Sequence, residues 1–147
     1  MGAKLVFMLL AVVVSIPGCK DLGEDARATD WYVYVLGKTW TLYALQINGV
    51  PIAIPSGQPY LLWFEDDKNY RGTSHCNSCF GTYSLVQKGS IRFSTLVCTE
   101  RLCPPPSLSD TFQHALQRVS AYQFEEGILV LLADNATTAL RFYRNIR

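Results

Sequence analysis

The sequence has 147 residues, a formal net charge of +1 at pH 7 and 49% hydrophobic residues, which suits one globular domain with a substantial core rather than a disordered chain. Its 13 Lys and Arg residues are balanced by 12 Asp and Glu residues, and they form no basic stripe of the kind that binds phosphate groups. We therefore do not expect nucleic acid as a partner.

The first 19 residues have the pattern of a bacterial export signal. Lys4 precedes an uninterrupted apolar run over residues 5–14, and Ser-Ile-Pro-Gly-Cys follows at residues 15–19. The run is about half of the roughly 20 residues that a membrane-spanning helix needs. Residues 16–19 resemble the lipobox of bacterial lipoproteins, in which the cysteine thiolate accepts a diacylglyceryl group. Cys19 is therefore the predicted lipidation site.

This pattern divides the chain into a signal peptide at residues 1–18, a lipidated tether at 19–30 and a domain at 31–147. Two or more acyl chains, such as palmitate, make membrane anchoring durable. Lys20 after the cysteine favours the outer membrane, where the domain would face the periplasm or the surface. The alternative is an ordinary signal cut after Ala28, which would release a soluble protein, but this site lies far from the apolar run.

Beyond the tether, short β-rich runs are separated by turn residues, a pattern that predicts an antiparallel sheet. In the first run, alternation places Trp40, Leu42 and Ala44 on one face, and Asn48 with Gly49 signals a hairpin turn. The predicted strands cover residues 38–46, 60–65, 70–73, 80–86, 90–97, 121–125, 128–133 and 138–144.

A helix is predicted after the three prolines at residues 104–106. Either Ser107 or Ser109 is expected to supply its N-cap oxygen. The fold class expected from the residues is α+β and mostly β, with a strongly curved antiparallel sheet and this one amphipathic helix packed against it. The helix is indicated by apolar residues that recur with a 3.6-residue period at Leu108, Phe112, Ala115, Leu116 and Val119.

Four cysteines remain after Cys19, namely Cys76, Cys79, Cys98 and Cys103. An even number of cysteines in an exported chain predicts two disulfides, although the residues alone allow three pairings. Two alternatives stay open at this point. Four thiolates could hold a zinc ion, or the Cys76-x-x-Cys79 unit could be a redox-active pair.

Other candidate chemistry is sparse. His75, beside Cys76, could assist a metal or a thiolate, or be a loop histidine without a role. His114 is expected to be a polar surface residue of the helix, and no serine-triad motif accompanies the two histidines. The acidic pairs at residues 66–67 and 125–126 lie at turns and are expected to be solvated. We find no catalytic constellation, and we expect neither an enzyme nor a cofactor.

The domain is rich in aromatic residues near its start. Most of them are expected in the core, and any remainder on one sheet face would form a surface for apolar or peptide-like ligands. The residues concerned are Trp31, Tyr32, Tyr34, Trp40, Tyr60, Trp63 and Tyr70.

Three short motifs occur in a family-like order at residues 37–42 (GKTWTL), 75–83 (HCNSCFGTY) and 99–104 (TERLCP). Through them, residues 36–144 resemble the META domain family, which includes the HslJ-like lipoproteins. The sequence departs from the family at His75, where a glycine is usual, and at Glu100, where the family has an arginine whose role is not carried over. The family-motif residues are Trp40, Asn77, Gly81, Tyr83 and Thr99.

This resemblance implies a half-open barrel with one helix. Members with two cysteines carry them at the positions of Cys76 and Cys103, so the resemblance implies this bridge and a second one between Cys79 and Cys98. It also implies a loose link to envelope stress or drug tolerance, without an established reaction.

The expected function is that of a membrane-anchored, monomeric binding or scaffold module without enzymatic activity. Its membrane partner is the lipid anchor, and an envelope protein, a peptide or a lipid is expected to bind at the open sheet face. The alternative is a thiol-disulfide or metal-dependent activity at Cys76 and Cys79.

Overall fold

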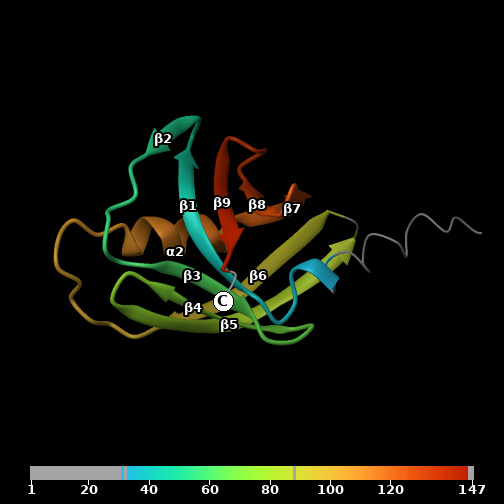
Figure 1. Cartoon of the computed structure of the whole chain (residues 1–147), viewed down its shortest axis with the longest axis horizontal. Helices are drawn as coiled ribbons and strands as arrows, with labels where there is room; N and C mark the ends of the chain where they lie inside the picture. Colours follow the sequence, from blue (N-terminus) through green and yellow to red (C-terminus); the bar gives the residue numbers. More distant parts are fainter. Residues whose placement is uncertain (1–30, 32, 88, 146–147) are drawn as a thin grey trace, which may run out of the picture.

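The computed structural model describes residues 31, 33–87 and 89–145 of the chain (Figure 1). The predicted signal peptide, Cys19, the tether and Tyr32 lie outside the described residues. The strands are β1 (Thr39–Ile47), β2 (Val50–Ile52), β3 (Tyr60–Phe64), β4 (Asn69–Ser74), β5 (Asn77–Gln87), β6 (Ser90–Cys98), β7 (Val119–Glu125), β8 (Ile128–Ala133) and β9 (Thr138–Arg144), and helix α2 spans Ser109–Gln117.

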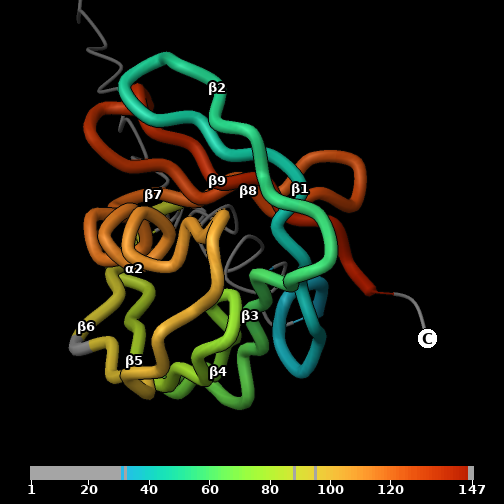
Figure 2. The backbone as a smooth tube through the Cα atoms, turned by 90° about the vertical axis from the view of Figure 1, so that its left-hand side faces the viewer, coloured from blue at the N-terminus to red at the C-terminus, as the bar shows by residue number. Residues whose placement is uncertain are grey.

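The strands form one antiparallel sheet that closes on itself. Neighbouring strands follow the order β1, β3, β4, β5, β6, β7, β8 and β9, and β9 pairs back with β1. Figure 2 shows β3–β6 on one side of this barrel and β1 with β7–β9 on the other. Strand β2 is an extension that pairs with residues 45–47 of β1, beyond the part that pairs with β3. The mostly-β fold with one packed helix is confirmed.

Helix α2 lies where the barrel is least completely paired. Strands β6 and β7 share only the Ser90–Ala121 pair in their ladder, and α2 contacts β6 together with β4, β8 and β9. Its buried residues include Phe112, Ala115 and Leu116, three of the positions that the helical period predicts. The helix therefore packs against the part of the barrel where β6 and β7 are joined by a single ladder pair.

Two hairpin turns follow directly from the residue types at them. Asn48 and Gly49 have φ angles of 50° and 80°, and Glu126 and Gly127 have φ angles of 48° and 86°. Two successive positive φ values are characteristic of the type I′ turn, which matches the twist of the strands that it joins. The Asn-Gly signal at 48–49 therefore correctly predicts the hairpin between β1 and β2.

A β-bulge in β1 changes which side chains point inward. The pairing of β1 with β9 shifts between Leu42 and Ala44, and an extra residue reverses the alternation beyond it. Trp40 and Leu42 are buried as predicted, but beyond the bulge Leu45 is buried and Ala44 is only half-buried. The prediction that Ala44 shares the inward face was therefore wrong.

Helix α2 begins without a serine cap. Its N-cap residue is Leu108, and no side chain makes a capping hydrogen bond. The Ser107 hydroxyl accepts a hydrogen bond from the Ser109 N–H at 3.2 Å, while the Ser109 hydroxyl contacts Ser74 of β4. The expectation that one of the two serines caps the helix was wrong, because Ser109 instead attaches the helix to the sheet.

The interior of the barrel is filled with aromatic rings. Trp31, on the helical turn that precedes β1, packs against Phe64, Tyr83 and Tyr122, with ring centroids 5.0, 5.8 and 4.6 Å away. Of the early aromatic residues, Trp31, Trp40, Tyr60 and Tyr70 are buried and Tyr34 and Trp63 are exposed. Within the described part of the chain, no helix has the length and apolar character needed to cross a membrane.

Candidate functional site: a disulfide-held loop beside an exposed row

Two disulfides join β5 and the turn before it to β6 and the segment after it. Cys76 is bonded to Cys103 and Cys79 is bonded to Cys98, which is the pairing that the family resemblance implies. Cys79 and Cys98 lie directly opposite each other in the β5–β6 ladder. The Cys76-x-x-Cys79 unit is therefore not a disulfide, because its two sulfurs belong to different bridges.

Asn77 holds the segment that follows β6. Its side-chain oxygen accepts hydrogen bonds from the Thr99 hydroxyl at 3.0 Å and from the Arg101 N–H at 2.8 Å. Its amide donates to the Arg101 carbonyl and to the Cys103 sulfur. The Thr99 hydroxyl in turn accepts from the Ser78 N–H at 3.2 Å. A buried amide thus satisfies the backbone of a segment that belongs to neither a strand nor a helix.

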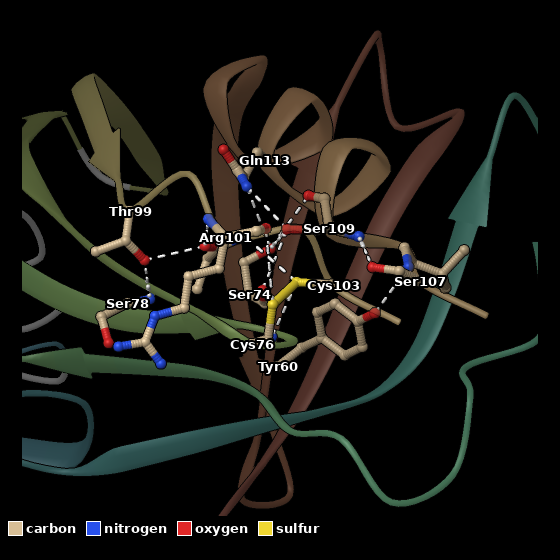
Figure 3. Close-up of a disulfide and its surroundings, with 12 residues drawn as sticks. Tyr60, Ser74, Cys76, Ser78, Thr99, Arg101, Cys103, Ser107, Ser109 and Gln113 are labelled. Atoms are coloured by element: carbon tan, nitrogen blue, oxygen red, sulfur yellow. Dashed lines mark hydrogen bonds between the residues drawn. A yellow bond between two sulfur atoms is a disulfide. The ribbon is translucent and has the colours of Figure 1, made fainter. Parts of the chain in front are cut away.

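The start of α2 is attached to the sheet by hydroxyl groups that surround the Cys76–Cys103 bridge (Figure 3). The Ser74 and Ser109 hydroxyls lie 2.9 Å apart, and the Gln113 amide donates to Ser109 at 3.0 Å. The Leu108 N–H donates to the Tyr60 hydroxyl at 2.8 Å. This cluster binds structural elements to one another, and its hydroxyls are engaged with neighbouring groups rather than arranged as a nucleophile with its base.

His75 occupies the turn between β4 and β5 with a φ of 60°. It is buried, its ring centroid lies 6.3 Å from that of Tyr60, and its Nδ1 atom has no hydrogen-bond partner. A positive φ explains why the family usually has glycine here, since glycine adopts it without steric cost. His114, in contrast, is exposed on α2. No group of three or more His, Cys, Asp or Glu side chains among the described residues could hold a metal ion.

The acidic residues at turns are exposed, with Asp66 the best-defined case. Hydrogen bonds from the Asn69 side chain and from the N–H groups of Lys68 and Asn69, together with the nearby charge of Lys68, lower the pKa of the Asp66 carboxyl. A carboxyl group that stays ionised in this way is a poor general acid. The backbone carbonyl oxygen of Asp66 accepts a 2.6 Å hydrogen bond from the Tyr83 hydroxyl, so this turn is part of the scaffold.

The remaining family-motif residues support the barrel. Trp40 is fully buried and donates from Nε1 to the Val35 carbonyl at 3.2 Å. Tyr83 is buried beside Trp31, whose Nε1 donates to its hydroxyl at 3.3 Å. Gly81 lies in β5 next to the irregularity in its pairing with β6. The motif residues that the structure describes are therefore positioned by packing and hydrogen bonding, and they do not converge on one cavity.

Sequence reasoning expected some aromatic residues to be exposed on one sheet face, but it missed the row of exposed side chains that crosses four strands. We call Trp63, Arg71, Phe80 and Val97 the outer row. The registers pair Trp63 with Arg71, Arg71 with Phe80 and Phe80 with Val97. Trp63 is 41% exposed and Phe80 is 56% exposed. The alternation within each strand could have marked these residues as outward-facing, but only the register brings them side by side.

A shallow depression of about 560 Å³ lies beside the outer row on β4 and β5. Arg71 contributes to its wall and is paired with Glu65, with Nε and Oε1 2.8 Å apart. Arg101 lies in the segment after β6 that Cys103 ties to Cys76, and its side chain extends toward Ser78 of β5 (Figure 3). The lining includes Glu65, Asn69, Arg71, Ser78, Phe80 and Thr82.

Comparisons with known proteins agree with this architecture. A solved structure from Burkholderia xenovorans superposes with a TM-score of 0.67 at 24% identity, covering 92% of this chain and 100% of that one. A DUF4847 family protein from Bacteroides vulgatus gives a TM-score of 0.57 at 17% identity, covering 79% and 98% of the two chains. No match was found among curated proteins. The family model of the META domain matches residues 34–145, and the chain therefore belongs to the META domain family.

Proposed function

We propose that this protein is a lipid-anchored module of the bacterial envelope that acts by binding rather than by catalysis, through the outer row and the depression beside it. The observation that carries the binding role is the exposure of Trp63 and Phe80 on one sheet face. Large apolar side chains that are left in water next to polar groups are typical of interaction surfaces. The link to envelope stress or drug tolerance rests on the family resemblance alone.

The interior of the barrel offers little room for a ligand. Its aromatic side chains are in mutual contact, as in the pair of Tyr70 and Phe93 with ring centroids 5.0 Å apart. Burial raises the pKa of the Tyr70 phenol, so this group stays protonated within the core. The proposed binding surface is therefore the outside of the sheet, where the outer row lies.

Anchoring is supported by the lipobox-like sequence at residues 16–19. The two disulfides are consistent with export, since such bonds persist in oxidising compartments. The alternative of thiol-disulfide exchange at Cys76 and Cys79 has less support, because each sulfur is bonded to a partner on another segment.

The binding role is tested by placing a photoreactive amino acid at position 80 of the full-length protein in living cells. The matched control carries it at Tyr143, which is 43% exposed on β9, outside β3–β6. We expect an adduct that forms at position 80 and is absent at position 143. The same adducts at both positions, or none at position 80, would contradict the proposal.

A further inference from the structure

We propose that the outer row binds a neutral oligosaccharide, with two sugar rings stacked on Trp63 and Phe80. This inference rests on the proposed function, because it names the ligand class of the same surface. It follows from the spacing of the two rings, the balance of charge around them and the pairing of the strands beneath them.

The two aromatic side chains are placed as separate platforms. Trp63 belongs to β3 and Phe80 to β5, and Arg71 of β4 lies between them in the register. Two strand spacings separate the platforms at their backbones, which amounts to about 9–10 Å. Adjacent rings of a β-1,4-linked sugar chain are only about half this distance apart, so the two platforms would stack alternate rings, and a trisaccharide is the shortest ligand that reaches both. One face of a pyranose ring carries C–H groups, which pack against the electron-rich face of an aromatic ring.

The charges at the outer row compensate each other. Arg71 forms an ion pair with Glu65 at 2.8 Å. Because the two charges neutralise each other, the surface between the platforms favours neither an anionic nor a cationic ligand. The lining also includes the Ser78 hydroxyl and the side-chain oxygen of Asn69, whereas the Asn69 side-chain nitrogen already donates to Asp66 and the Thr82 hydroxyl is bonded to Ser94. A hydroxyl both donates and accepts hydrogen bonds and an amide oxygen accepts them, as the hydroxyls of a sugar require.

The strand pairing disfavours the two other ligand classes considered for this face. An extended peptide gains affinity by adding to a free sheet edge, but β4 and β5 are each paired on both sides at the outer row. Strand β6, which shares a single ladder pair with β7, is contacted by α2 instead. An acyl chain needs an enclosed cavity that buries most of its surface, whereas the depression is shallow and carries the ion pair of Glu65 and Arg71 in its wall. Ring stacking needs neither an edge nor a deep cavity.

Intrinsic fluorescence gives a direct test, because Trp63 is the one exposed tryptophan of the three in the chain. Trp31 and Trp40 are 1% and 0% exposed. Titration with tetra-N-acetylchitotetraose, and separately with cellotetraose, is expected to shift the emission to shorter wavelength in a saturable way with at least one of them. Neither sugar doing so would overturn the inference.

Variants then locate the site by ligand-observed NMR, which does not depend on the fluorophore. Trp63→Ala and Phe80→Ala should each weaken sugar binding by about tenfold or more, and Tyr143→Ala should leave it unchanged. Equal affinity of Phe80→Ala and the parent protein would overturn the inference. A protein or lipid adduct specific to position 80, without sugar binding, would overturn the sugar while leaving the proposed function standing.

Discussion

Asn77 is the residue on which the segment after β6 most depends. Replacing it with alanine removes the acceptor for Thr99 and Arg101 and the donor to the Arg101 carbonyl. The Thr99 hydroxyl and the backbone N–H and carbonyl of Arg101 are partly buried, and in this variant they lose their hydrogen-bond partner. We therefore expect Asn77→Ala to lower the free energy of unfolding by about 2 kcal/mol. Urea unfolding measures the change.

Ser84→Ala provides the control for Asn77→Ala, since Ser84 is exposed on the same strand. We expect this control to change stability by less than about 0.5 kcal/mol. If Asn77→Ala fell within the same range, the hydrogen bonds of Asn77 would not be holding the segment. The sequence motif identifies Asn77 as important, but its partners are 22 to 26 residues away and are visible only in the fold.

The positive φ of His75 predicts an unusual order of stabilities. His75→Gly and His75→Ala both lose the buried imidazole ring, so they differ mainly in backbone preference. Because a left-handed conformation costs an L-residue about 1 kcal/mol, we expect the glycine variant to be more stable than the alanine variant by roughly that amount. Thermal unfolding of the two variants measures the difference.

The same two substitutions at Ser84 should give the opposite order, because glycine destabilises an ordinary strand position relative to alanine. Equal stability of the two His75 variants would contradict the strained turn. The residue type itself could not have predicted this turn, since only a few per cent of residues other than glycine adopt a positive φ, even though histidine is among the types enriched there. Only the family resemblance, with glycine at this position, pointed to it.

At the scale of elements, the Cys76–Cys103 bridge fixes the approach of the chain to α2. It joins two residues 27 positions apart in the sequence, one in the turn before β5 and the other in a segment without regular structure. Removing it with Cys76→Ala and Cys103→Ala should cost about 3 kcal/mol. Since the segment itself has few backbone hydrogen bonds to retain it, we expect amide hydrogen exchange to accelerate first in residues 99–108.

The Cys79–Cys98 bridge is the internal comparison, because it joins two strands that are already paired. Removing it should cost stability without that selective acceleration in residues 99–108. Identical exchange patterns in the two double variants would contradict the separate roles assigned to the bridges.

The elements themselves were largely predictable, for physical reasons that also explain the exceptions. Alternation and β-branched content revealed the long strands, and the 3.6-residue period revealed α2. Strand β2 was missed because it has three residues and contains Pro51, and such a strand carries little pattern of its own. The bulge in β1 was missed because Tyr43 looks like an ordinary strand residue until β9 pairs beside it.

At the scale of the whole molecule, the sequence could place the core but not the candidate site. Burial is encoded in local periodicity, so Trp40 and Leu42 were correctly placed on one face, and most of the early aromatic residues were correctly expected in the core. The outer row joins residues from four strands, and its existence depends on three registers at once. A shift of one residue in any of them would send a member to the other face.

The account rests on a lipidated Cys19 and on four structural cysteines in an oxidising compartment. The measurement that tests this most directly is the intact mass of the full-length gene product, extracted from bacterial membranes without reductant. We predict a chain that starts at Cys19 with a diacylglyceryl and an amide-linked acyl group, and that lacks four hydrogens because each of two disulfides removes two. An unmodified N-terminus, or four free thiols in the domain, would contradict it.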